Sequence, residues 1–168
     1  EIFTSRGIPQ KTLDETLSEA LTEGFSMEGF LKILERRAPH LTLPVQKLLE
    51  EMGAWLSRAL ALYPDAERLR ALPATHTPIV IVTFGNPEYQ KQKIEMLRIQ
   101  YDDIIVTRAK STKHEAMRTL LARYGAPIIF VDDKKSELDA VREDGLSETE
   151  VITCHINRPD HPQDTASK

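Results

Sequence analysis

Four short apolar runs in the second half of the chain constrain its fold more than any other feature. They begin at Ile79, Ile104, Ile128 and Val151, and a helical pattern follows each of the first three. Runs that are apolar throughout, rather than alternating with polar residues, are typical of strands covered on both faces. Strands that alternate with helices at this spacing form βαβ units. The sequence therefore predicts an α/β fold with a Rossmann-like parallel sheet.

The chain from about residue 11 to residue 61 has helical patterns throughout. A capping box, Thr12-x-x-Glu15, predicts the start of a first helix, a second is expected over about 27–38, and Thr42 is expected to cap a third. The apolar stripes of the first and third helices are Leu13, Leu17, Leu21, Val45, Leu48, Leu49, Met52, Trp55, Leu56 and Ala59. Three amphipathic helices must bury these stripes, so we predict a small all-helical subdomain whose stripes serve packing.

Composition excludes several classes of protein. The 168 residues are 40% hydrophobic with a formal charge of -4, which permits a real core and argues against a general nucleic-acid binder. No apolar run reaches the ~20 residues that cross a bilayer, and the first residues lack a signal-peptide pattern. Cys154 is the single cysteine and the histidines show no ligand spacing, so a zinc site is not expected. We expect a cytoplasmic protein with no nucleic-acid or membrane partner.

A candidate anion site follows the run that begins at Ile79. Asn86 is a good N-cap and Pro87 a good first helical residue, so a helix should begin there. The N–H groups at such a helix start favour an anion. The hydroxyl of Thr83 and the backbone of Phe84 and Gly85 would add to a phosphate site. Alternatively, this segment is only a β-turn whose threonine satisfies its own backbone.

Two adjacent carboxylates, Asp132 and Asp133, end the run that begins at Ile128. Like charges side by side at a buried strand end need a cation, and Mg²⁺ prefers a few carboxylates, waters and a phosphate oxygen. We expect Asp133 as the first metal ligand, with Asp132 or Glu137 as a second. Alternatively, the pair caps the next helix, and Lys134 and Lys135 provide the counter-charges.

Lysines supply a third kind of group between these segments. Lys113 begins a predicted helix that ends at Gly125, and from there it could stabilise the charge of a transferring phosphoryl group. Lys110, in the preceding loop, is expected to be a solvated charge.

In their order along residues 62–159, these pieces resemble the haloacid dehalogenase superfamily of phosphohydrolases. Residues 81–86 resemble its second motif, where a Thr or Ser binds phosphate; Lys113 and the four residues after it resemble the third. Residues 129–133 resemble the fourth motif, which supplies acidic ligands to Mg²⁺. Residues 63–66 resemble the helix before the second motif, and residues 151–159 the last core strand and its exit.

This resemblance implies a core of residues 1–10 and 62–160 and a helical cap of residues 11–61. The polar residues 161–168 are expected to form a flexible tail. It also implies two-step chemistry, in which an aspartate attacks the phosphoryl group and water cleaves the aspartyl-phosphate. Thr83 and Lys113 would be the catalytic residues present. The family's first motif, Asp-x-Asp-x-Thr after an apolar strand, has no counterpart in the sequence. We expect it in a segment upstream of residue 1.

The leading hypothesis is therefore a Mg²⁺-dependent phosphatase of a small phosphorylated metabolite. A non-catalytic binding or interaction module with the same fold is the alternative, favoured by the missing aspartate. A phospho-acceptor receiver domain uses similar residues, but its Asp pair would come before the hydroxyl residue in the chain. The sequence does not distinguish a phosphatase from a dehalogenase or mutase, and it gives neither the substrate nor the oligomeric state.

Overall fold

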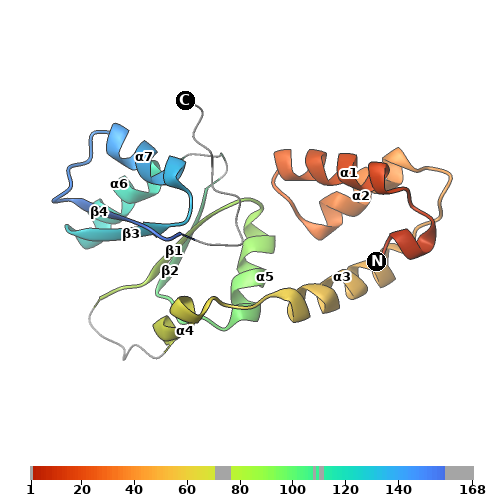
Figure 1. Ribbon diagram of the computed structural model, residues 1–168, viewed down its shortest axis with the longest axis horizontal. Coiled ribbons are helices and arrows are strands. Elements are labelled where there is room, and N and C mark those ends of the chain that lie inside the picture. The colour runs from red at the N-terminus through yellow and green to blue at the C-terminus, as the bar shows by residue number, and fades with distance from the viewer. Residues whose placement is uncertain (1, 71–76, 108, 110–111, 158–168) are drawn as a thin grey trace. The chain divides into compact units, whose positions relative to one another are not determined.

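The computed structural model describes residues 2–70, 77–107, 109 and 112–157 (Figure 1). The chain divides into two compact units, Glu1–Val106 and Thr107–Lys168. Lys110 and the predicted tail, residues 161–168, lie outside the described residues. Within the described residues, no helix combines the length and the apolar character needed to cross a bilayer.

The first unit begins with helices. A 3-10 turn, Thr4–Arg6, precedes α1 (Gln10–Thr22), α2 (Met27–Arg37), α3 (Val45–Ala59) and α4 (Pro64–Arg70). Helix α2 packs against both α1 and α3, and these elements share one hydrophobic core. Its buried members are Ile8, Ala20, Phe30, Leu31, Ile33, Leu34 and Leu48. The predicted helical region therefore has a core of its own.

Two predicted helix starts are wrong. Helix α1 begins after Pro9 with no side-chain cap, which places Thr12 inside the helix, where its hydroxyl cannot cap the end. Helix α3 begins after Pro44 rather than at Thr42. A residue that precedes proline is pushed out of the helical region, so α3 cannot extend back through Leu43.

The apolar stripes are less buried than the sequence predicts. The exposed fractions of Leu17, Leu21 and Trp55 are 42%, 50% and 55%. Their neighbours Leu13 and Met52 do pack against the core. Each stripe is therefore only partly covered by the core that the three helices share.

The first unit continues with β1 (Val80–Phe84), α5 (Pro87–Leu97) and β2 (Asp103–Thr107), and β1 pairs with β2. The predicted helix start is confirmed: Asn86 is the N-cap of α5, its side chain accepts a hydrogen bond from the N–H of Tyr89, and Pro87 is the first helical residue. The helix ends at Arg98 in a left-handed conformation, with φ of 52°.

The second unit contains α6 (Lys113–Tyr124), β3 (Ile128–Asp132), α7 (Lys135–Glu143) and β4 (Val151–His155). Strands β3 and β4 are parallel, with Ile128 opposite Val151 and Asp132 opposite His155, which confirms the predicted parallel pairing. Both helices contact β3 (Figure 1). Their buried side chains form the core of the unit. That core contains Met117, Leu120, Phe130, Leu138 and Val141.

The side chains of β3 alternate between a buried and an exposed face. Phe130 and Asp132 are 6% and 9% exposed, whereas Ile129 and Val131 are 65% and 47% exposed. Ile152 of β4 is 44% exposed. Helices α6 and α7 of the same unit pack against β3, and the expected cover of its second face stays a prediction.

Candidate functional site

The predicted phosphate loop lies at the end of β1. The hydroxyl of Thr83 donates a hydrogen bond to Gln90 Oε1 at 3.2 Å. Gly85 follows with φ of 134°, a conformation that a side chain would strain, and α5 begins directly after it. The loop therefore brings a hydroxyl close to the start of a helix, where N–H groups favour an anion.

Gln90, on the helix that follows this loop, is a site residue that sequence reasoning missed. It lies on the first turns of α5, and a Cβ added to Gly85 would come within 2.8 Å of Gln90 Nε2. Its amide group therefore contacts both the hydroxyl of Thr83 and the backbone of the loop. The signal in the sequence was its place four residues after the N-cap Asn86, one helical turn along α5.

The turn between α1 and α2 contacts the same loop. A Cβ added to Gly24, where φ is 86°, would lie 3.4 Å from the backbone nitrogen of Asn86 and 3.6 Å from the carbonyl carbon of Gly85. The next residue, Phe25, packs edge-on against the ring of Tyr89, with centroids 5.0 Å apart. A helical region that sequence predicted as a separate cap thus contributes two residues beside the candidate phosphate loop.

Burial changes the titration of two neighbouring groups on α5. Desolvation raises the pKa of Tyr89 and lowers the pKa of Lys93. The Lys93 ammonium lies 5.6 Å from the centroid of the Tyr89 ring. The phenol that supports Phe25 is therefore neutral over the whole physiological range of pH.

In the second unit, Lys113 and Asp132 form a buried ion pair. Lys113 is the first residue of α6 and Asp132 the last of β3, and their Nζ and Oδ2 atoms lie 2.5 Å apart. The two side chains are only 13% and 7% exposed. Asp132 Oδ1 also accepts a hydrogen bond from the backbone N–H of Lys134 at 2.8 Å. The structure thus joins two predicted site residues, with Lys113 as the counter-charge.

The other predicted metal ligands surround the end of β3. The Asp133 side chain is exposed, and its backbone carbonyl accepts a hydrogen bond from His155 Nε2 at 3.1 Å. Glu137, in the first turn of α7, is 6% exposed. No three His, Cys, Asp or Glu side chains within the described residues are grouped so that they could share a metal ion. One or two carboxylates with waters can suffice for Mg²⁺, so the metal assignment of Asp132, Asp133 and Glu137 stays a prediction.

The two sets of predicted residues belong to different units. Thr83, Phe84 and Gly85 lie in the first, whereas Lys113 and the carboxylates lie in the second. The structure brings Lys113 and Asp132 together, and the convergence of Thr83 with that pair stays a prediction.

Comparison with known proteins supports the fold. No protein-family model matches the chain. No curated protein sequence matches it either. The chain is similar in structure to a haloacid dehalogenase-like family hydrolase from Xanthomonas campestris, with a TM-score of 0.59 and 18% sequence identity. The match covers 92% of this chain and 69% of that hydrolase. The chain therefore has an α/β fold similar to that of this hydrolase.

Proposed function

We propose that this chain belongs to a Mg²⁺-dependent phosphatase of the haloacid dehalogenase type, acting on a small phosphorylated metabolite. The observation that carries the proposal is the buried Lys113–Asp132 pair at the carboxyl end of β3, with the exposed carboxylate of Asp133 beside it. Ligands of open α/β sheets bind at the carboxyl ends of strands. An ammonium next to two carboxylates at such an end suits a phosphoryl group and a divalent ion.

Each residue has a role in this proposal. Thr83 and the N–H groups at the start of α5 would hold the phosphoryl oxygens, and Gln90 would orient the Thr83 hydroxyl. Lys113, held in place by Asp132, would stabilise the charge of the phosphoryl group. Asp133, with Asp132 or Glu137, would hold Mg²⁺, which when bound would neutralise charge on the phosphate.

The nucleophile of this proposal is an aspartate carried by a strand from a segment ahead of Glu1. Its carboxylate would attack phosphorus as the bond to the leaving oxygen breaks, and water would then cleave the aspartyl-phosphate. Within the described residues, β3 pairs with β4 alone. Ile129 and Val131 keep exposed apolar side chains, which a further strand and its attached segments could cover. This arrangement supports the proposal that one strand of the sheet comes from outside residues 1–168.

The test is turnover of a phosphate monoester with Mg²⁺ by a protein that includes the upstream segment. Asp133→Asn and Lys113→Met should each reduce kcat at least about 100-fold, because charge stabilisation in the transition state is lost. Asp139→Asn is the matched control, since Asp139 lies on α7 and pairs with Arg142 at 3.3 Å. Full activity of Asp133→Asn would remove the metal assignment.

A non-catalytic module with the same fold is the second candidate. The absence of any Asp-x-Asp-x-Thr motif from the sequence favours it. Mg²⁺ and phosphate together should raise the melting temperature of an enzyme that binds both, by linkage, and should leave that of a pure interaction module unchanged.

A further inference from the structure

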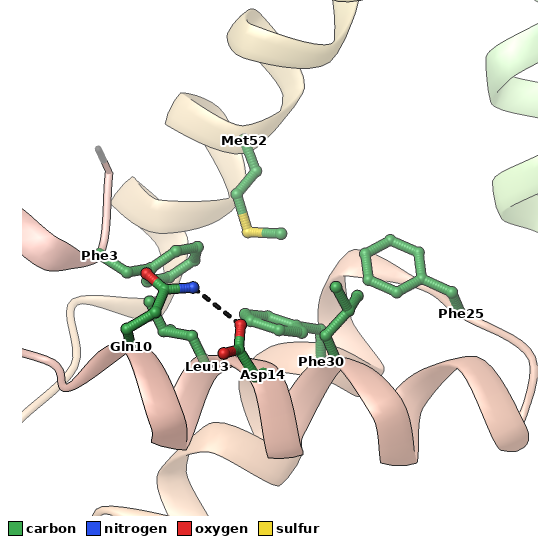
Figure 2. A pocket seen from close by; sticks show the side chains of 8 residues that line it. Phe3, Gln10, Leu13, Asp14, Phe25, Phe30 and Met52 are labelled. Atoms are coloured by element: carbon green, nitrogen blue, oxygen red, sulfur yellow. Dashed lines mark hydrogen bonds between the residues drawn. The ribbon is translucent and has the colours of Figure 1, made fainter. Parts of the chain in front are cut away.

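A concave apolar pocket lies in the helical region of the first unit. The N-terminal segment, α1, α2, α3 and the turn between α1 and α2 all contribute to its wall (Figure 2). Its apolar lining is Phe3, Leu13, Leu17, Phe25, Phe30 and Met52. In Figure 2 the thioether of Met52 and three aromatic rings surround the same space.

The size of the pocket limits its occupant. Its volume is about 220 Å³, and an apolar cavity of about 150 Å³ binds benzene. A space of this size accepts one aromatic ring or one branched alkyl group, whereas a helix or a strand would need a much longer groove. The pocket therefore fits a group of a small molecule.

One polar pair on α1 restricts the chemistry further. Gln10 Nε2 donates a hydrogen bond to Asp14 Oδ1 at 2.8 Å, and both side chains line the pocket. A carboxylate there repels an anion and so disfavours a phosphate group in this space. A phosphorylated molecule would enter with its apolar end first and keep its phosphate outside.

The pocket adjoins the candidate phosphate loop through one residue. Phe25 lines the pocket and also packs against Tyr89 of α5. Gly24, its neighbour, lies against Gly85 and Asn86. The contact between Phe25 and Tyr89 therefore links the pocket to the helix that begins at the loop.

We propose that this pocket binds the apolar body of the substrate, an aromatic ring or a branched alkyl group of similar size. The assignment of that body to a substrate rests on the proposed phosphatase function. The binding itself is independent of catalysis, because neither Thr83 nor Lys113 lines the pocket.

The test uses the methionine methyl groups as reporters and 4-methylphenol as the probe. The chain has four methionines, and only Met52 lines the pocket. In the ¹³C-methyl-labelled protein, 4-methylphenol should shift the Met52 signal saturably, with a Kd on the order of 1 mM. The signals of Met96 and Met117 should stay in place. No shift at Met52, or equal shifts at all three, would overturn the proposal.

Two tryptophan variants sharpen this test. Leu17→Trp should fill the pocket and weaken binding at least about tenfold. Leu21→Trp is the control and should not, because Leu21 lies on the same helix, is also exposed and is outside the lining. Equal binding to both variants would also refute the site. With the upstream segment present, benzyl phosphate should then be turned over with a higher kcat/KM than methyl phosphate. Saturable binding without turnover would refute the phosphatase and keep the pocket; equal kcat/KM values would refute its role in substrate selection.

Discussion

Removing either partner of the Lys113–Asp132 ion pair should destabilise the second unit strongly. At 2.5 Å, two unit charges attract by about 7 kcal/mol at an effective dielectric constant of about 20. Desolvation of both groups offsets much of this attraction, because the side chains are 13% and 7% exposed. A single substitution removes the attraction and leaves one buried charge behind. We therefore expect Lys113→Met and Asp132→Asn each to lower the free energy of unfolding by about 3–5 kcal/mol.

The double variant is the informative one. Asp132→Asn keeps an Oδ1 acceptor for the N–H of Lys134, so it removes the charge and little else. With both charges gone no buried ion remains, and Lys113→Met/Asp132→Asn should be more stable than the sum of the single effects by at least about 2 kcal/mol. Urea unfolding followed through the methyl signal of Met117, which is 1% exposed in this unit, measures each free energy.

A second ion pair provides the control for burial. Arg118 Nε and Asp144 Oδ2 also lie 2.5 Å apart, but the Arg118 side chain is 57% exposed. Because water screens that pair, the effects of Arg118→Met and Asp144→Asn on the free energy of unfolding should be nearly additive in a double-mutant cycle. If Lys113 and Asp132 couple no more strongly than Arg118 and Asp144, the argument from burial is refuted.

Three further predictions concern the first unit. Gly24→Ala should destabilise it by about 1–2 kcal/mol, because φ is 86° there, and Trp55 fluorescence in urea measures the loss; unchanged stability would contradict the strain. Gly53→Ala, in the middle of α3 with open space at its Cβ, should stabilise it by about 0.5–1 kcal/mol, and a loss in the same assay would contradict the open space. Burial raises the pKa of Tyr89 above 10.0. The stability that the neutral phenol contributes is therefore present below pH 10 and is lost as pH rises through the folded pKa. Tyr89→Phe should reduce the fall in melting temperature between pH 9 and pH 11.

Local signals in the sequence predicted the elements well. The start of α5 was read correctly because an N-cap followed by proline acts within one turn and needs no distant partner. The starts of α1 and α3 were misread where Pro9 and Pro44 decided the boundary instead of a hydroxyl. The parallel pairing of β3 and β4 followed from the apolar runs and their spacing.

Burial and partnership were harder to predict, because periodicity shows which face is apolar and not whether anything covers it. Trp55 and Ile129 belong to apolar faces and are nevertheless exposed. Lys113 and Asp132 were both predicted as site residues, but their pairing with each other depends on the packing of α6 against β3. Gln90 was missed because its place one turn after the N-cap Asn86 gains meaning only when the end of β1 is placed beside it.

The bare face of β3 has a practical consequence for handling the protein. The side chains of Ile129, Val131 and Ile152 are apolar and exposed, and they lie on paired strands at the edge of a sheet. Exposed apolar strand edges promote association between chains. A preparation limited to these 168 residues should therefore aggregate as the protein concentration rises. Lysine at position 129 or 131 would act as a gatekeeper and keep it dispersed without touching the helices packed behind the strand.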